Sequence, residues 1–118
     1  MTAPNLVSIA TINLKTTASN LTTSLADILV NAASSNKALK INGITISNTG
    51  TADITTDVVV DIGGTNYYLI KTGKVIAGTS LIVVSKGSAG LYLEEDTKIE
   101  ALASAATGDI VITYEELS

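Results

Sequence analysis

The stretch ITTDVVVDIGGTNYYLIK, residues 54–71, decides the fold of this chain. Its first nine residues alternate between two sets, as in a half-buried β-strand, where successive side chains point to opposite faces. One face holds Ile54, Thr56, Val58, Val60 and Ile62, and the other holds Thr55, Asp57, Val59 and Asp61. Gly63-Gly64-Thr65-Asn66 then supplies residues that tolerate the positive φ of a tight turn. The stretch predicts a β-hairpin around which the rest of the chain packs.

The remainder of the chain consists of short extended runs separated by turn residues. Valine, isoleucine and threonine make up 40 of the 118 residues, and these types fit a pleated, half-buried surface. Turn signals about every eight to twelve residues are typical of a sandwich or barrel. We therefore predict an all-β fold, an antiparallel β-sandwich with jelly-roll-like topology and an extended N-terminal arm. The other predicted strands lie near residues 6–15, 25–31, 37–48, 81–86, 91–93, 98–104 and 110–115.

Three segments carry more specific predictions. Residues 21–36 have apolar side chains at helical spacing, but their neighbours favour strands, so we predict a strand over 25–31. The apolar residues of the next segment change faces at Asn42-Gly43, which predicts a β-bulge. The nearly continuous apolar run of residues 81–86 predicts a strand that is covered on both faces.

The N-terminal part allows two interpretations. Residues 1–22 are either the first strand of the sandwich or an arm that packs on a neighbour, and residues 23–118 form the sandwich domain. An extended arm needs another chain to satisfy its backbone N–H and C=O groups. We therefore predict a homo-oligomer, with a trimer as the expected form. The predicted interface residues are Leu6, Val7, Ile9, Ile12 and Leu14 of the arm and Tyr67 and Tyr68 of the hairpin.

The composition excludes several classes of chemistry. The sequence contains no histidine and no cysteine, which removes the usual general base and the thiolate ligands of zinc. The adjacent carboxylates Glu94, Glu95 and Asp96 fit a solvated turn. With a net charge of −4 and no arginine, the chain is a poor binder of nucleic acid. Its apolar runs are too short to span a membrane. We predict no enzymatic activity, no cofactor, no metal, no nucleic-acid partner and no membrane partner.

The balance of apolar and charged residues points to a protein partner. Hydrophobic residues make up 46% of the chain and charged residues only 15%, against about 25% charged in typical soluble domains. A chain of this kind is expected to have apolar surface that a partner covers. The only aromatic residues are four tyrosines, and an exposed tyrosine can stack on a sugar. A carbohydrate-binding or adhesion module is therefore one alternative.

Several short motifs carry a resemblance to a known group of proteins. They are ALKINGI at residues 38–44, VVV at 58–60, YYL at 67–69, LYLEED at 91–96 and YEELS at 114–118. With these motifs the chain resembles the small all-β virion structural proteins of tailed phages that infect marine cyanobacteria. The resemblance implies a non-enzymatic part of the virion, which assembles in the host cytoplasm and binds the major capsid protein or other virion proteins.

The place in the particle follows from charge. An acidic protein is repelled by packaged DNA, so the outer head surface is the better location. We therefore expect a capsid decoration or cement protein. A neck, tail or baseplate component is the alternative within the same class.

Overall fold

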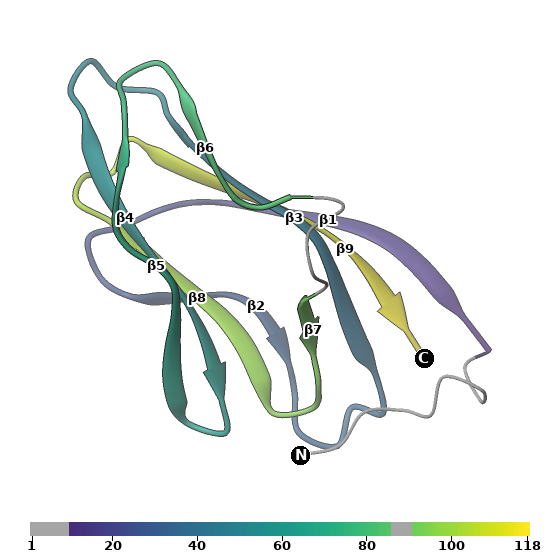
Figure 1. The fold of residues 1–118 in the computed structure, drawn as a ribbon. Helices are drawn as coiled ribbons and strands as arrows, with labels where there is room; N and C mark the ends of the chain where they lie inside the picture. Colours follow the sequence, from purple (N-terminus) through teal and green to yellow (C-terminus); the bar gives the residue numbers. More distant parts are fainter. Residues whose placement is uncertain (1–9, 86–90) are drawn as a thin grey trace.

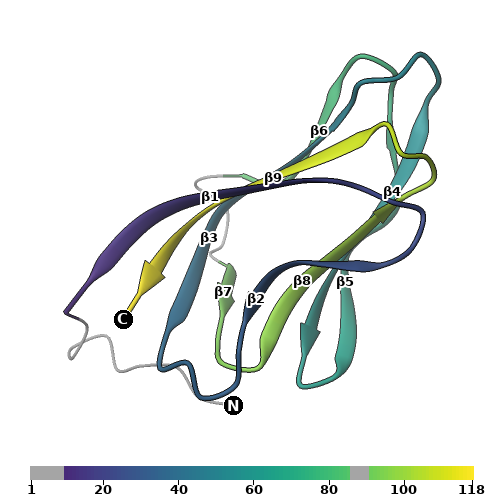
Figure 2. The same ribbon diagram turned by 180° about the vertical axis from the view of Figure 1, so that it is seen from behind.

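The computed structural model describes residues 10–85 and 91–118, which form two antiparallel β-sheets packed as a sandwich (Figure 1). The first sheet has the order β1-β9-β3-β6, with β7 also pairing with β3. The second has the order β2-β8-β4-β5. Figure 2 shows the same two layers from behind. The strands are β1 (Ile12–Asn20), β2 (Ala26–Asn31), β3 (Ala38–Asn48), β4 (Ile54–Ile62), β5 (Thr65–Val75), β6 (Ser80–Val84), β7 (Leu91–Leu93), β8 (Thr97–Ala103) and β9 (Gly108–Leu117).

The chain crosses repeatedly from one sheet to the other. Strands β1 to β4 alternate between the sheets, the β4–β5 hairpin stays in the second sheet, and β9 returns to the first, between β1 and β3. This order is that of a jelly roll, to which β7 adds one short strand. The prediction of an all-β antiparallel sandwich is thus confirmed.

The predicted central hairpin is present as β4 and β5. Val58 and Val60 are buried between the sheets, whereas Asp57 and Asp61 are only partly buried on the other face. The turn is shorter than predicted, because β5 already begins at Thr65. Gly63 and Gly64 have φ of 59° and 93°. Two consecutive positive φ values give the turn type whose twist matches that of antiparallel strands.

The core lies between the two sheets and consists almost entirely of aliphatic side chains. Strands β3 and β9 contribute from the first sheet, and β4 and β8 contribute from the second. Burial of these side chains away from water is the main stabilising term of the fold. The buried apolar residues of this cluster are Leu21, Leu29, Leu39, Ile41, Ile44, Ile46, Ile54, Val58, Val60, Val75, Leu93, Ile99, Ala101, Ala103, Ile110 and Ile112.

The structure confirms some boundaries and corrects others. The strand predicted at residues 25–31 is β2, and the bulge predicted at Asn42-Gly43 lies between Ile41 and Gly43 in the pairing with β9. The first strand, predicted near residues 6–15, coincides with β1 only at residues 12–15, because β1 runs from Ile12 to Asn20, and residues 6–9 lie outside the described residues. The run at 81–86 is also not covered on both faces. It forms β6 at the edge of its sheet, where the Ile82 side chain is 63% exposed.

The first and last strands lie side by side. Strand β1 pairs with β9 along its whole length, from Ile12 opposite Leu117 to Asn20 opposite Asp109. The contact extends beyond the strand, because the backbone N–H groups of Ala10 and Thr11 both donate to the carbonyl oxygen of Ser118. Strand β1 therefore has one neighbour, β9, within the described residues.

Candidate functional site

The strand β1 is the most exposed element of the sandwich. Eight of its nine residues are exposed and the remaining one, Thr17, is partly buried. The Ile12 and Leu14 side chains are 61% and 78% exposed. Because β9 covers only one side of β1, the backbone groups along its other side have no strand partner in the described part of the chain. Such an edge is a template for pairing with another chain.

The face of the first sheet that points away from the core continues this exposed surface. In register, Thr16 lies opposite Thr113, and Ala18 lies opposite Val111. The charged residues Lys40 and Glu115 on this face pair with each other at 3.6 Å. The uncharged side chains that are at least partly exposed on this face include Leu14, Thr16, Ala18, Thr45, Ile82, Tyr92, Val111 and Thr113.

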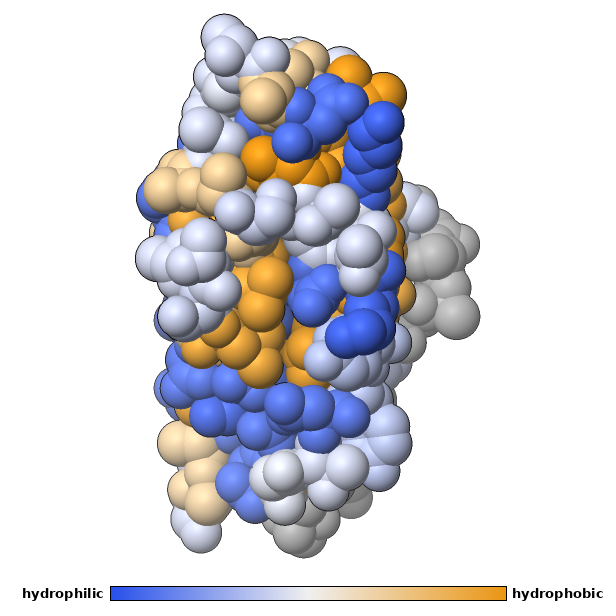
Figure 3. All heavy atoms as spheres, turned by 90° about the vertical axis from the view of Figure 1, so that its left-hand side faces the viewer, coloured by the Kyte–Doolittle hydropathy of each residue, from blue (hydrophilic) through white to orange (hydrophobic). Residues whose placement is uncertain are grey.

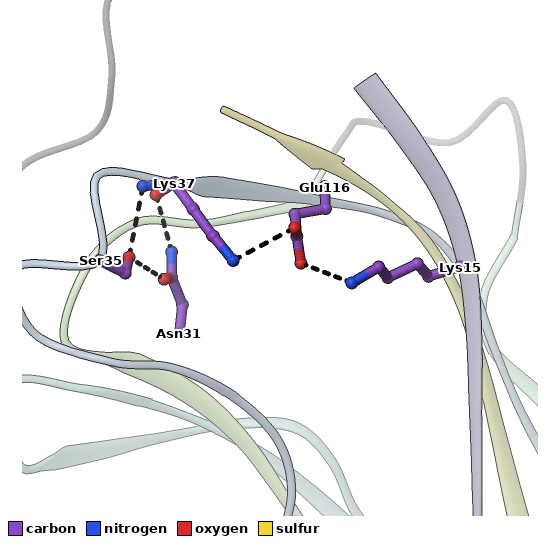
Figure 4. Close-up of polar contacts among 5 residues, drawn as sticks. All are labelled: Lys15, Asn31, Ser35, Lys37 and Glu116. Atoms are coloured by element: carbon purple, nitrogen blue, oxygen red, sulfur yellow. Dashed lines mark hydrogen bonds and ion pairs between the residues drawn. The ribbon is translucent and has the colours of Figure 1, made fainter. Parts of the chain in front are cut away.

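An ion cluster fixes the N-terminal half of β1 to the sheet (Figure 4). Lys15 Nζ lies 3.0 Å from one carboxylate oxygen of Glu116, and Lys37 Nζ lies 3.2 Å from the other. The hydrogen bond from Lys15 lowers the pKa of the Glu116 carboxyl, and Lys37 acts in the same direction. The same bond raises the pKa of Lys15. The cluster thus neutralises the single charged side chain of β1.

The loop that carries Lys37 is held by a buried amide (Figure 4). Asn31 Nδ2 donates to the carbonyl oxygens of Lys37 and Leu93, each at 2.9 Å, and Asn31 Oδ1 accepts a hydrogen bond from Ser35 Oγ. Ser35 Oγ in turn accepts from the backbone N–H of Lys37 at 3.3 Å. These bonds place Lys37 beside Glu116 at the end of β9.

The hairpin tyrosines lie on the second sheet. Tyr67 pairs with Val60 and Tyr68 with Val59, so the two rings point to opposite faces. They are 55% and 51% exposed, and Lys71 Nζ lies 4.4 Å from the Tyr68 ring centroid. Figure 3 views the side on which β4 and β5 lie and shows hydrophobic patches separated by hydrophilic side chains. The two tyrosines do not form one stacking platform.

A half-open pocket of about 270 Å³ lies at one end of the second sheet. Its charged lining residues are Asp27, Asp61, Asp96 and Lys98. Lys98 Nζ lies 3.0 Å from Asp27 and 4.0 Å from Asp61, so a protein cation already occupies the space between these carboxylates. Within residues 10–85 and 91–118, no three His, Cys, Asp or Glu side chains are grouped to hold a metal ion.

The predicted interface residues divide into three groups. Ile12 and Leu14 lie together on β1, and Tyr67 and Tyr68 lie on β5 of the other sheet. The structure does not bring these two pairs together. Leu6, Val7 and Ile9 lie outside the described residues. Sequence reasoning missed the Lys15–Glu116–Lys37 cluster, because Lys15 and Glu116 are 101 positions apart and no local pattern connects them.

Comparisons with known proteins add a likeness of fold. No family model and no curated protein matches the chain. A solved structure of a subunit from Bacillus endospore appendages, described as a novel family of disulfide-linked pili, is similar at 19% sequence identity and a TM-score of 0.46. The match covers 91% of this chain and 87% of that chain. The likeness concerns the fold alone, and the present sequence has no cysteine from which to make a disulfide.

Within the described ranges, the protein has no helix of the length and apolarity needed to cross a membrane.

Proposed function

We propose that this chain is a non-enzymatic structural subunit that associates with further copies of itself in a larger protein assembly. The observation that carries the proposal is the long exposed edge of β1. Its outer backbone groups pair with no strand of residues 10–85 and 91–118, and it also presents the apolar side chains of Ile12 and Leu14. Burying such an edge against another strand satisfies its backbone and removes apolar area from water. The histidine-free and cysteine-free composition fits a structural role.

The assembly that we propose is the virion of a tailed phage, with this chain as a decoration or cement protein on the outer head surface. The resemblance of the motifs at residues 38–44 and 91–96 to phage structural proteins supports a place in the virion, and the net charge of −4 favours a position away from the packaged DNA. A neck, tail or baseplate position is the alternative within the same assembly. The major capsid protein or other virion proteins are the further partners of this proposal.

Self-association is tested with the purified full chain. Light scattering coupled to size-exclusion chromatography is expected to give a mass above 12.1 kDa that rises with concentration. The double variant Ile12→Lys/Leu14→Lys is expected to shift the population toward monomer, because it places charges along β1. Ile82→Lys is the matched control, since Ile82 is equally exposed on the opposite edge of the sheet. A wild-type chain that stays monomeric at all concentrations would contradict the proposal.

The location is tested by copy number in purified phage particles. Quantitative mass spectrometry is expected to give hundreds of copies for a head decoration protein, since it covers a repeating capsid lattice. A small fixed number would favour the neck, tail or baseplate. Absence from particles would remove the virion from the proposal while leaving self-association standing.

A carbohydrate-binding or adhesion role is the second candidate. The exposure of Tyr67, Tyr68 and Tyr92 favours it, because an exposed ring can stack on a sugar. Glycan-array binding that is lost in Tyr67→Ala or Tyr68→Ala would support this role. Binding to no glycan would leave the structural subunit as the remaining candidate.

A further inference from the structure

The four edges of the two sheets differ in how well they can accept another strand. Strand β2 has six residues and a register shift, and β5 has two register shifts and a positive φ at Thr72. The free side of β3 carries only the short strands β6 and β7, of five and three residues. Short strands and bulges protect an edge against pairing. Strand β1 has none of these features, because its nine residues pair with β9 without a register shift.

We propose that the outer edge of β1 pairs with β1 of a second copy in antiparallel orientation, so that the first sheet continues across a two-fold axis. This inference rests on the proposed self-association and names the strand that carries it. In the described residues β1 is the only long and regular edge, and so its best-matched strand on a second copy is β1 itself. A contact that uses the same surface on both copies is two-fold symmetric and closes as a pair.

The sequence of β1 suits this antiparallel pairing. Thr16 is the central residue of the nine, so a symmetric register places Thr16 opposite Thr16 of the second copy. Leu14 then lies opposite Ala18 and Asn13 opposite Ser19 of the second copy. Opposed threonines are a favourable cross-strand pair, and the Leu14–Ala18 pairs remove apolar surface from water. Thr16, Leu14 and Ala18 are exposed in the single chain and are therefore available for these contacts.

The charges on β1 also permit the contact. Lys15 is the single charged residue of the strand, and Glu116 of its own chain neutralises it at 3.0 Å. In the symmetric register Lys15 lies opposite Thr17 of the second copy and not opposite another lysine. Like charges directly opposite each other would weaken the pair. The carboxylates nearest to β1 lie on β9, where Glu116 pairs with Lys15 and Lys37, Glu115 pairs with Lys40, and Asp109 accepts a hydrogen bond from Asn20 Nδ2.

A cysteine reporter tests the register directly. The chain has no cysteine, so Thr16→Cys introduces a single thiol at the proposed two-fold axis. Residues directly opposite in an antiparallel pair have Cα atoms about 4.5–5.5 Å apart, within the range of about 4.4–6.8 Å that a disulfide spans. Mild oxidation of the full-length variant is therefore expected to give a covalent dimer in high yield. Thr113→Cys is the control, because Thr113 lies beside Thr16 on β9 and would be separated from its copy by both β1 strands.

A charge-exchange experiment tests the same contact without a covalent bond. Thr16→Glu and Thr16→Lys each place two like charges opposite each other, so each alone is expected to weaken dimerisation by about fivefold. An equimolar mixture is expected to restore association as a mixed dimer, which native mass spectrometry identifies from the two masses. Thr113→Glu on the same exposed face is expected to leave dimerisation unchanged. Circular dichroism confirms that each variant is folded.

The outcomes separate this inference from the proposed function. Association that survives Thr16→Glu, or a mixture that does not restore it, overturns the β1–β1 contact and leaves self-association standing. Loss of association in Leu6→Lys/Val7→Lys together with failure of the Thr16 mixture would identify the N-terminal segment of another copy as the added strand. Loss in Thr113→Glu would identify the exposed face as the interface. A wild-type chain that never associates overturns both proposals.

Discussion

At the scale of single residues, two buried amides connect loops that the strands alone would leave independent. Asn48 is 2% exposed, and its Nδ2 donates to the carbonyl oxygens of Ala52 and Val75. Its Oδ1 accepts from the backbone N–H of Gly50 and from Thr107 Oγ1, each at 3.0 Å. Asn31 has the same role at the other end of β3. Every buried polar side-chain atom in the described ranges has a hydrogen-bond partner.

Asn48→Ala is expected to lower the free energy of unfolding by about 3 kcal/mol, because it leaves several buried partners without a hydrogen bond. Urea denaturation of the purified chain measures this loss. Asn13→Ala on the exposed strand β1 is the control, with an expected change below about 0.5 kcal/mol. Equal midpoints for wild type and Asn48→Ala would show that the amide does not hold these loops.

Val60→Asp tests the inward face of β4. Val60 is buried within the core cluster, so the new carboxylate would be unpaired there. The expected cost is several kcal/mol, comparable with the whole stability of a small domain. Thr113→Asp places the same group on an exposed position of β9 and is expected to fold normally. An unchanged melting temperature for Val60→Asp would contradict the assignment of this face.

At the scale of elements, the ion cluster at Glu116 makes the attachment of β1 dependent on pH. The pKa of Glu116 is lowered in the folded chain by its hydrogen bond to Lys15. The cluster therefore stabilises the fold above the ordinary pKa of a glutamate. This stabilisation is lost as the pH falls through the lowered pKa, where the carboxylate becomes protonated.

Glu116→Gln is expected to be less stable than wild type at pH 7, and the two proteins are expected to converge in strong acid. The difference is expected to be smaller than that of Asn48→Ala, because both lysines of the cluster are exposed, and ion pairs with exposed partners contribute little and are screened by salt. Urea denaturation at pH 7 and in strong acid measures the difference in the free energy of unfolding between the two proteins. Glu94→Gln is the control, since Glu94 makes no ion pair among the described residues. A difference that is the same at both pH values would exclude the ion cluster as its cause.

The elements that could be predicted from sequence are those that bury one face. Strand β4 alternates clearly because the core covers one side and solvent the other, and Ile99, Ala101 and Ala103 of β8 do the same. Strand β1 buries neither face fully, so its sequence INLKTTASN carries no period, and the prediction missed its C-terminal half, residues 16–20. The apolar run at residues 81–86 does form a strand, β6. An apolar sequence alone, however, does not show whether another element covers both faces of the strand.

The candidate site was predictable only in part, for a related reason. The apolar side chains of Ile12, Leu14, Tyr67 and Tyr68 could be selected as interface residues from composition, and the structure leaves all four exposed. Their division between two sheets could not be predicted, because it depends on the strand order. The regularity of the β1 edge likewise depends on its pairing with β9, nearly a full chain length away.

At the scale of the whole molecule, the two outer faces of the sandwich differ in charge. The outer face of the second sheet carries Asp27, Asp57, Asp61, Lys98 and Glu100, and burial raises the pKa of Glu100. The outer face of the first sheet carries fewer charged residues on β3 and β9, namely Asp109 and the Lys40–Glu115 pair. The β1–β1 pairing continues the first sheet and stacks no outer face on another, so it buries none of the charged side chains of the second sheet's outer face.

Deletion of residues 1–15 tests the separation of fold from assembly. Strand β1 contributes no buried side chain, and the core residue Leu21 follows it. The shortened chain is therefore expected to keep its β circular dichroism with a modest loss of melting temperature, and to lose association. The measurements are a thermal melt and light scattering at low concentration. Unfolding of the shortened chain, or association at the wild-type level, would contradict this prediction.

The pairing of the first strand with the last has a consequence for how the protein is made. A ribosome releases β1 first of the nine strands and β9 last, so β1 emerges long before its neighbour exists. The local β4–β5 hairpin can form as soon as its two strands have emerged, whereas the first sheet closes only after β9 has emerged, and such distant pairing is slow. Until β9 has been synthesised, the backbone groups on both edges of β1 lack the strand with which β1 pairs in the folded chain. Neighbouring nascent chains on one messenger RNA can therefore exchange their β1 strands during this time. In a circular permutant that joins the end of β9 to the start of β1, the ribosome would release the two strands in succession, and the delay between them would disappear.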